Sequence, residues 1–213
     1  MSFEIAGGTL EDGLVVGNAF DKYGSKNPIV RRIMRGFDKS LASLVVDAAP
    51  VSIHEIGCGE GYWTLRWLAA GIDARGCDVS HTAIELARRN ARTAGFAANR
   101  FEVRSIYDLN AGRDGADLVV CCEVLEHLDD PEAGLRALQR IAGRHLVLSV
   151  PREPVWRLLN LARGKYVARG GNTPGHVQHW SRRDFVRLVA RHFRVERVLT
   201  PLPWTMLSCR PHD

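Results

Sequence analysis

A glycine-rich turn behind an apolar run is the first place in this sequence where a ligand could be held. Gly57, Gly59 and Gly61 follow the apolar run 51–56 and precede a helix-like stretch that starts at Tyr62. Glycine allows a tight turn and lets a ligand approach the backbone closely. The helix N-terminus behind the turn offers unpaired N–H groups and a partial positive charge. The turn therefore suits a ligand with an anionic group.

The spacing of the glycines and of two acids narrows the class of ligand. A dinucleotide fingerprint, G-x-G-x-x-G, would place its third glycine at position 62, where the chain has Tyr62. The glycines follow G-x-G-x-G instead, and Glu55 stands two positions before the first of them. Asp78 ends the next apolar strand, 21 positions after Gly57, where a carboxylate can accept hydrogen bonds from both ribose hydroxyls. This spacing speaks against a nicotinamide dehydrogenase and favours another ligand that carries a ribose.

A second group of reactive side chains follows the apolar run that ends at Cys122, in the stretch EVLEH. His127 is the expected general base, because an imidazole with an ordinary pKa of roughly 6.5 exchanges protons near neutral pH. The alternative is a structural histidine bonded to backbone. Glu123 is expected to contact a ligand rather than to act as the base. His176 and His179 precede a helix start and can reach back over the strand ends, so we expect them at the reaction centre and in the acceptor pocket, respectively.

Strand-like and helix-like stretches alternate along the chain and fix where these residues lie. Helices are expected over residues 28–46, 62–70, 80–90, 130–141 and 181–190, and strands over 51–56, 72–77, 101–103, 117–122, 145–150, 195–199 and 205–209. This alternation predicts an α/β fold, a single-domain Rossmann-like doubly wound sheet that is mostly parallel. Ligands bind such sheets beyond the carboxyl ends of the strands, where the glycine turn, Asp78 and His127 would meet.

The pattern E-x-G-x-G-x-G, the strand ending in Asp78 and the EVLEH stretch together resemble the class I S-adenosylmethionine-dependent methyltransferases, especially those acting on small molecules. The resemblance covers residues 51–209. It implies S-adenosyl-L-methionine as the cofactor and S-adenosyl-L-homocysteine as the product. Ser105 stands where the family often has an acid that binds the adenine amino group. The cofactor-binding residues implied by the resemblance are Glu55, Gly57, Cys58, Gly59, Gly61, Asp78, Val79, Ser105, Ile106 and Glu123.

The same resemblance divides the single domain, residues 1–213, into functional parts. Residues 1–48 would form an N-terminal helical cap or lid, 49–150 the cofactor-binding core, 151–180 a substrate lid inserted after the fifth strand, and 181–213 a C-terminal helix and strands. The segment 20–28 looks like the entry segment that closes over the cofactor in many relatives. In it, Tyr23 would face the methyl centre as a catalytic residue, and Lys26 would pair with the cofactor carboxylate.

The insertion 151–180 is the part of the sequence that bears on the acceptor. Between residues 151 and 170 five basic residues stand against one acid, Glu153. A stretch of this length inside a compact domain is usually functional. We expect a roof over the acceptor pocket, with Trp156, Tyr166 and Trp180 stacking on a flat substrate. An interfacial helix at a membrane surface, a subunit interface, and a helix that packs its leucines on the core stay open as alternatives.

Four residues also resemble a metal site. Glu123, Glu126, His127 and His176 match the E-x-x-E-H pattern with a later histidine that is found in small-RNA 3′-terminal 2′-O-methyltransferases. A divalent ion there would lower the pKa of a ribose hydroxyl and orient it. The sequence shows no RNA-binding domain and no arginine-rich tail, so we expect no metal and regard an RNA substrate as the alternative.

Composition sets further limits. The chain has 213 residues and a formal net charge of +5, an excess too mild for a dedicated duplex-DNA binder. Its five cysteines contain no CxxC pair, which argues against a disulfide framework or a thiolate zinc site. The sequence begins without a signal-peptide pattern, and no apolar stretch approaches the roughly 20 residues that span a bilayer. We expect a cytoplasmic protein, with peripheral membrane contact and oligomerisation left open.

The sequence thus predicts an S-adenosylmethionine-dependent methyltransferase for a small cyclic or aromatic acceptor, such as a quinone, phenol or indole. Oxygen, nitrogen and an electron-rich carbon all stay open as the methylated atom. The alternative within enzymes is a metal-assisted O-methyltransferase acting on the 3′ ribose of RNA. The alternative from another class is a cofactor-binding partner protein without catalysis.

Overall fold

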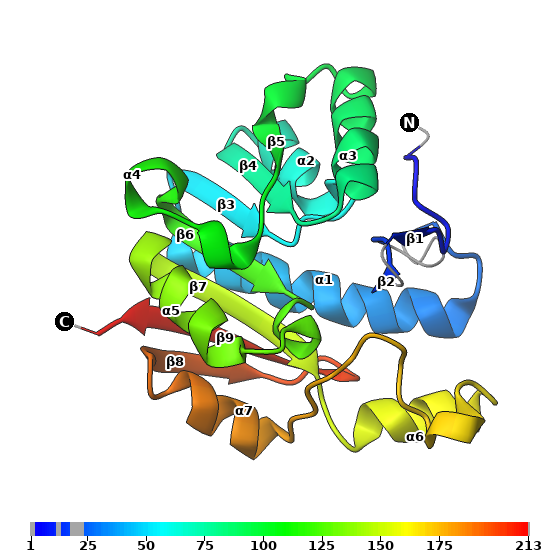
Figure 1. Ribbon diagram of the computed structural model, residues 1–213. Helices are drawn as coiled ribbons and strands as arrows, with labels where there is room; N and C mark the ends of the chain where they lie inside the picture. The colour runs from blue at the N-terminus through cyan, green and yellow to red at the C-terminus, as the bar shows by residue number, and fades with distance from the viewer. Residues whose placement is uncertain (1–2, 12–13, 18–23, 213) are drawn as a thin grey trace.

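Seven strands form one sheet at the centre of the molecule (Figure 1). The computed structural model describes residues 3–11, 14–17 and 24–212. The strands of this sheet are β3 (Ser52–Ile56), β4 (Asp73–Asp78), β5 (Phe101–Val103), β6 (Ala116–Cys122), β7 (Ala142–Pro151), β8 (Phe193–Leu199) and β9 (Trp204–Pro211). Their order is β5-β4-β3-β6-β7-β9-β8. The five strands β3 to β7 run parallel, and β9 runs antiparallel to both of its neighbours.

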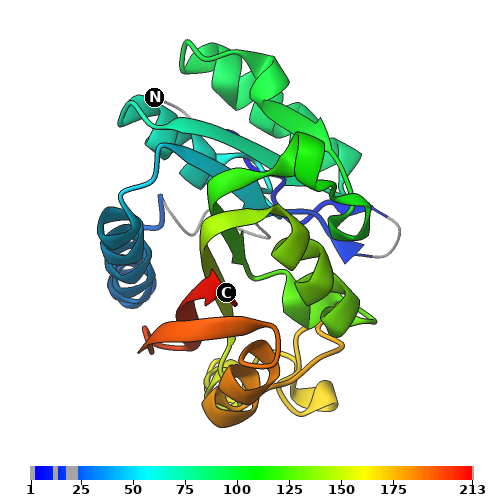
Figure 2. The ribbon, with the colours of Figure 1, turned by 90° about the vertical axis from the view of Figure 1, so that its left-hand side faces the viewer.

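Helices cover both faces of the sheet (Figure 2). On one face lie α1 (Pro28–Ala48), α2 (Tyr62–Ala69) and α3 (His81–Thr93), whose apolar residues form two core clusters with the strands. On the other face α5 (Pro131–Ile141) and α7 (Arg182–Val189) pack against β6, β7 and β9. The central strand β6 is apolar along most of its length because it is buried on both faces. The predicted doubly wound, mostly parallel α/β fold is confirmed.

Capping side chains set the starts of four helices. Asn27 accepts backbone N–H groups at the start of α1, Ser80 at α3, Asp130 at α5 and Ser181 at α7. Such caps satisfy N–H groups that the first helical turn leaves unpaired. Ser80 follows β4 closely and Asp130 follows β6 after a short connection, so these two caps also fix where the chain leaves the carboxyl edge of the sheet.

Two segments outside the predicted core contain elements that the sequence did not specify. Among the described residues of 1–48, α1 is the only helix, and before it β1 (Leu10–Glu11) and β2 (Leu14–Val15) form an antiparallel pair. The insertion 151–180 contains α6 (Val155–Ala162) and the 3-10 turn η4 (Val167–Arg169). The roles of these two segments as lids stay predictions. Among the described helices, none has both the length and the apolar character that crossing a membrane would require.

Strand order reverses between β3 and β6, since the chain moves outward from β3 in one direction and from β6 in the other. At such a switch point the loops after the two strands separate and leave a crevice at the carboxyl edge of the sheet. The glycine turn follows β3 and the EVLEH stretch follows β6. The fold therefore brings both groups of candidate residues to the same edge.

Candidate active site

The glycine turn takes a backbone conformation that side chains rarely adopt. Gly57, Gly59 and Gly61 have φ angles of 76°, 52° and 84°. A side chain at Gly57 would overlap Val124, and one at Gly61 would come within 2.8 Å of the Phe101 ring. At Gly59 an added Cβ would meet nothing closer than 3.8 Å. Two of the three glycines are thus required by packing inside the protein, and Gly59 is the one with open space above it.

Glu55 is buried in β3 and fastens the start of α2. Its Oε2 accepts a hydrogen bond from the backbone N–H of Thr64 at 2.9 Å and another from the Thr64 hydroxyl at 2.5 Å. The N-cap residue of this helix is Gly61, which has no side chain to do the same. A carboxylate near a helix N-terminus also interacts favourably with the helix dipole. Glu55 therefore holds the glycine turn against the sheet, whether or not it also contacts a cofactor.

Asp78 ends β4 beside the glycine turn. Its Oδ2 accepts the N–H of Gly59 at 2.9 Å and its Oδ1 accepts the N–H of Ser80 at 3.0 Å. Burial raises the pKa of Asp78 above its ordinary value, while these backbone N–H groups act in the opposite direction. A carboxylate has about four acceptor positions, so Asp78 keeps capacity to accept from a ribose hydroxyl. The next residue, Val79, is 67% exposed and borders the same space.

The N-terminal segment lies against this turn through residues that sequence reasoning missed. Glu11 accepts hydrogen bonds from the Ser80 hydroxyl and from the N–H of Thr82 at the start of α3. Glu60, 1% exposed, accepts the N–H of Ala6 at 3.0 Å. Glu60 stands inside the glycine-rich turn, and this unusual place for an acid was the signal in the sequence that could have pointed to the contact. Together these contacts dock the segment around β1 and β2 beside the candidate cofactor site.

The remaining predicted cofactor residues serve the packing of the fold. Cys58 is buried, and burial raises the pKa of its thiol well above the ordinary value, so it is no nucleophile. Ser105 caps the 3-10 turn η2 (Ile106–Asp108) by accepting the N–H of Tyr107. Ile106 is 6% exposed and belongs to the main core. An adenine contact here would have to use the backbone of Ser105 and Ile106.

Glu123 is held in a strained conformation directly after β6. Its φ of 61° lies in the left-handed region, which is unusual for a residue with a side chain. Its Oε1 accepts a hydrogen bond from the Ser149 hydroxyl at 2.9 Å, and its Oε2 accepts one from the Trp204 indole at 2.6 Å. Strain of this kind often accompanies functional sites. The carboxylate thus ties β6 to β7 and β9 at the crevice.

His127 ends the 3-10 turn η3 (Leu125–His127), and a carbonyl group fixes its tautomer. Its Nδ1 lies 2.9 Å from the carbonyl oxygen of Gly175. A carbonyl only accepts hydrogen bonds, so Nδ1 carries the proton and Nε2 keeps its lone pair. Partial removal from water lowers the pKa of His127. The ring is therefore neutral near pH 7 and able to accept a proton.

His176 lies edge-on to His127 and stacks on Trp156. The ring centroids of the two histidines are 4.9 Å apart with planes at 90°, and those of Trp156 and His176 are 5.8 Å apart with planes at 28°. Burial, followed by the neighbouring His127, lowers the pKa of His176 to about 3. The Trp156 indole donates to the Thr173 hydroxyl at 2.9 Å. The insertion therefore places the rings of Trp156 and His176 beside His127, and these three rings form one wall of the candidate site.

The structure brings three of the four metal-pattern residues together. One ligand atom from each of Glu126, His127 and His176 lies within 4.8 Å of the others. Glu123 is not part of this group, because its carboxylate is bonded to Ser149 and Trp204. A carboxylate with two imidazoles is a donor set that divalent transition metals accept. The backbone oxygen of Glu126 also accepts two N–H groups of the insertion and so fixes its position.

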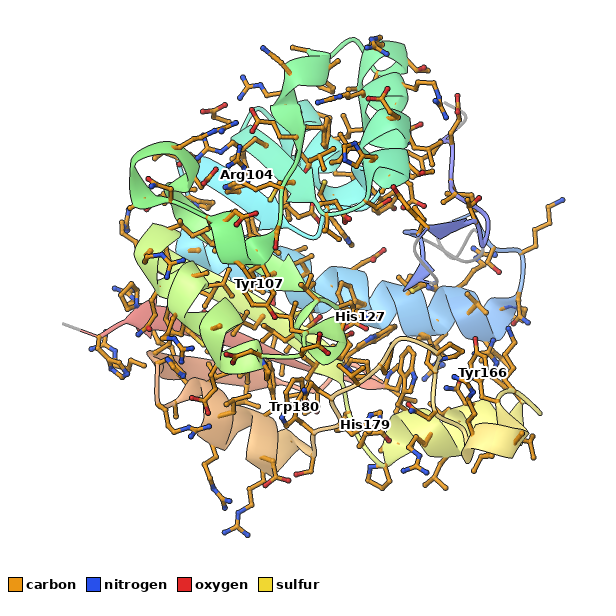
Figure 3. All side chains as sticks on the ribbon, viewed as in Figure 1. Arg104, Tyr107, His127, Tyr166, His179 and Trp180 are labelled. Atoms are coloured by element: carbon orange, nitrogen blue, oxygen red, sulfur yellow. The ribbon has the colours of Figure 1, made fainter. Side chains whose placement is uncertain are left out.

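The other predicted acceptor residues do not join this wall. Tyr166 lies beyond α6, away from His127 (Figure 3). Trp180 packs on Phe185 of α7, with ring centroids 5.7 Å apart. The Nδ1 of His179 lies 4.0 Å from the carboxylate of Glu153. We expected Trp156, Tyr166, His179 and Trp180 to share one pocket; the structure places Trp156 on His176 and Trp180 on Phe185. Lys26 is exposed ahead of α1, and Tyr23 falls outside the described residues.

Comparisons with known proteins find methyltransferases. The family described as "Methyltransferase domain" matches residues 54–144. A ubiquinone biosynthesis O-methyltransferase of Xanthomonas oryzae pv. oryzae is 27% identical over 146 residues, which cover 67% of this chain and 59% of that relative. The same enzyme of Cupriavidus pinatubonensis is 29% identical over 128 residues, covering 58% and 51% of the two chains. The chain thus spans about three fifths of the length of the first of these relatives.

Solved structures show the same fold. Magnesium protoporphyrin IX methyltransferase of Synechocystis PCC 6803, with bound S-adenosylhomocysteine, aligns with a TM-score of 0.66 at 21% identity over 89% of this chain and 90% of that one. An N-methyltransferase of Bradyrhizobium japonicum WM9 aligns with a TM-score of 0.63 at 20% identity over 92% and 94% of the two chains.

Proposed function

Because the chain belongs to the class I S-adenosylmethionine-dependent methyltransferases, we propose that it transfers a methyl group from S-adenosylmethionine to a small cyclic or aromatic molecule. The observation that carries the proposal is the fixed tautomer of His127, whose free Nε2 stands at the edge of the sheet that also carries the glycine turn and Asp78. A hydroxyl or ring N–H acceptor loses a proton when it is methylated. A neutral imidazole can take that proton.

The residues of the turn suit the cofactor. Asp78 would accept both ribose hydroxyls, Gly59 would let the methionine part lie on bare backbone, and exposed Val79 would border the adenine. When bound, S-adenosylmethionine supplies a methyl group on a positively charged sulfur, which is a good leaving group. The task left to the protein is to align the acceptor, exclude water and move its proton.

We propose that the acceptor lies against the wall formed by His127, His176 and Trp156. These rings offer flat apolar surface, and aromatic pairs of this kind contribute beyond their buried area. The similarity to ubiquinone biosynthesis O-methyltransferases supports a phenol or quinol as the acceptor, with oxygen as the methylated atom. The exposed Leu158 and Val167 lie outside this wall, where a peripheral membrane contact would use them.

The test is transfer of label from methyl-labelled S-adenosylmethionine to fractions of a cell extract, and to separate phenols, quinols and indoles, with and without chelator. The proposal expects chelator-insensitive label in a small organic-soluble product. Label that appears only in RNA and disappears with chelator would refute it and make Glu126, His127 and His176 a metal site. Cofactor binding without label in any fraction or acceptor would point instead to a protein without catalysis.

A further inference from the structure

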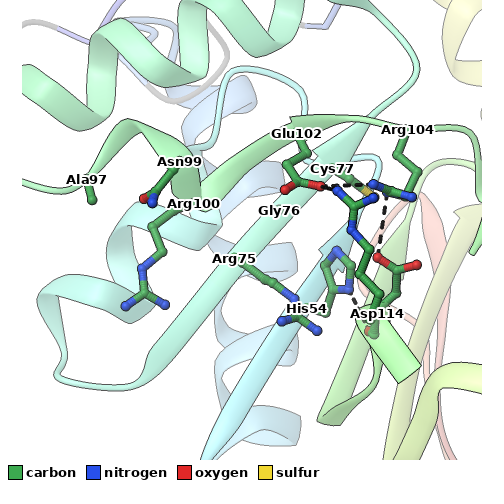
Figure 4. Close-up of a pocket in the computed structure, with 11 residues that line it drawn as sticks. His54, Arg75, Gly76, Cys77, Ala97, Asn99, Arg100, Glu102, Arg104 and Asp114 are labelled. Atoms are coloured by element: carbon green, nitrogen blue, oxygen red, sulfur yellow. Dashed lines mark hydrogen bonds and ion pairs between the residues drawn. The ribbon is translucent and has the colours of Figure 1, made fainter. Parts of the chain in front are cut away.

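A hollow of about 490 Å³ opens on the face of the sheet that carries α5, over β3, β4 and β5 (Figure 4). It exists because the connection from β5 to β6 is short. That connection contains only η2 and the four-residue helix α4 (Ala111–Asp114), too little to cover the strands. The residues that line the hollow are His54, Arg75, Gly76, Cys77, Ala97, Asn99, Arg100, Glu102, Arg104, Arg113 and Asp114.

The hollow is separate from the candidate active site because strand residues alternate between faces. On β3, Glu55 points to α2, where it bonds Thr64, and the preceding His54 points to the opposite face. On β4, a side chain at Gly76 would meet Cys58 and Thr64 on the α2 face, whereas Arg75 lines the hollow. The glycine turn and the hollow thus lie on different sides of the same strands.

Positive charge exceeds negative charge around the hollow. Its lining includes four guanidinium groups but only two carboxylates. Glu102 is shared, because Arg104 approaches it at 3.0 Å and Arg113 at 2.5 Å. Asp114 pairs with Arg104, at 3.6 Å. Arg104 and Arg113 thus face two carboxylates, so the excess positive charge of the lining lies with Arg75 and Arg100.

Arg75 is the clearest donor toward an added anion. One of its terminal nitrogens donates to the carbonyl oxygen of Gly115 at 2.7 Å, and among the described residues no carboxylate pairs with it. Arg100 reaches the same hollow and pairs with Asp73, an acid outside the lining. Guanidinium groups bind phosphate through parallel N–H donors, which makes arginine the usual residue for that ligand.

His54 supplies an acceptor at the floor of the hollow. Its side chain is 3% exposed, and its Nδ1 lies 2.8 Å from the carbonyl oxygen of Asp114. Nδ1 therefore carries the proton, and Nε2 has a lone pair for which the described residues provide no donor. Burial lowers the pKa of His54 to about 4, so the ring stays neutral at pH 7. Since His54 lines the hollow, this nitrogen can accept a hydrogen bond from a ligand or from water there.

We propose that this hollow binds a small phosphorylated anion that also carries a hydroxyl, with Arg75 and Arg100 on its oxygens and the Nε2 of His54 accepting from the hydroxyl. Inorganic phosphate has both features at neutral pH, because it keeps at least one P–O–H group. Sulfate has the same shape and the acceptor oxygens but no proton. At pH 7 sulfate carries at least as much negative charge as phosphate, so the arginines give phosphate no advantage. A preference for phosphate would therefore come from the acceptor Nε2 of His54.

The experiment is calorimetric titration of the full chain with phosphate and with sulfate at pH 7 and constant ionic strength. Saturating S-adenosylhomocysteine is present, so that the glycine turn is not a competing site. We expect phosphate to bind about 10-fold tighter than sulfate, the effect of one hydrogen bond of roughly 1.4 kcal/mol. Arg75→Gln should weaken phosphate binding 10-fold or more, and Arg183→Gln, a matched change of an exposed arginine on α7, should not.

Equal binding of phosphate and sulfate by the unchanged protein would overturn the role of His54, and this comparison needs no variant that might misfold. Phosphate affinity that is the same in Arg75→Gln and in Arg183→Gln would overturn the site itself, as would no phosphate binding at all. Where His54→Phe folds, it should bring the ratio of the two affinities to about one while sulfate binding is retained.

Discussion

The two sides of the candidate active site are built differently. On the cofactor side, four of the five residues of β3 are buried, and so are four of the eight residues of α2. On the acceptor side, α6 has one buried residue, Asn160, and every residue from 161 to 169 is exposed. The cofactor side is therefore part of the core, whereas the acceptor side is attached to it by a few hydrogen bonds and by the packing of Trp156.

This difference separates residues that both stabilise the fold and belong to the candidate site from residues that belong to the site alone. Gly57 and Glu55 hold the sheet and the helix α2 together and belong to the proposed cofactor site, so a change there should act on folding and on binding at once. His176 and Trp156 reach the site from a segment anchored by Asn160, which donates to the carbonyl oxygen of Gly171 and to the Thr173 hydroxyl. Changes on that side should alter the reaction without unfolding the protein.

The largest expected effect is the loss of stability in Gly57→Ala. The new methyl group would overlap Val124 at a φ of 76°. We expect a loss of about 2–5 kcal/mol in the free energy of unfolding, combining left-handed backbone strain with overpacking. Denaturant unfolding measures it. Gly164→Ala, on the acceptor side at a φ of 65° with no atom within 4 Å of the added carbon, is the matched control and should cost about 1–2 kcal/mol. Equal losses in the two variants would contradict the comparison.

The next effect is on turnover. His127→Gln should lower kcat about 100-fold, a typical contribution of a general base, with unchanged affinity for S-adenosylhomocysteine and an unchanged melting temperature. Because partial removal from water lowers the pKa of His127 and its neutral form is the active one, activity should fall on the acid side below pH 6.5. His179→Gln, whose ring faces Glu153 instead, should keep full kcat. A parallel loss of cofactor affinity in His127→Gln would show that the residue shapes the binding site rather than acts as the base.

The sequence predicted the strands and the glycine turn of the cofactor side well because the residues proposed to bind the cofactor also build the fold. Apolar strands followed by glycines, and by Asp78, carry their positions in their spacing. The acceptor side carries no such signal. Trp156 and Trp180 look equivalent in the sequence, yet Trp156 stacks on His176 and Trp180 packs on Phe185. Which ring each tryptophan meets depends on the path of the chain around α6. The docking of Glu11 on Ser80 depends on a contact across 69 positions and left no local pattern.

Stability should also depend on pH through His54 on the sheet. The pKa of this histidine is lowered to about 4, chiefly by burial, with Arg75 and Arg104 adding to the shift and Asp114 opposing it. Between pH 6.5 and 4 the unfolded chain binds a proton that the folded chain does not, so this contribution to stability is present above pH 6.5 and is lost as the pH falls. The loss is on the order of 2–3 kcal/mol. In His54→Gln the acid-induced decrease should be smaller by that amount; an identical pH profile would show that other groups cause it.

The smallest expected effect belongs to the outer face of α6. Leu158 is 60% exposed, so Leu158→Ser removes little buried apolar surface and should change the free energy of unfolding by less than about 0.5 kcal/mol. The same substitution at Leu138 of α5, which is fully buried, should cost several kcal/mol. Denaturant unfolding measures both losses of unfolding free energy. If Leu158→Ser loses as much as Leu138→Ser, α6 is packed against something in solution. The contrast between a cofactor side built into the core and a loosely attached acceptor side would then be wrong. If the cost is small while KM for the acceptor rises, α6 acts on the substrate from an exposed position, because a change that leaves the fold intact can reach the reaction only through binding.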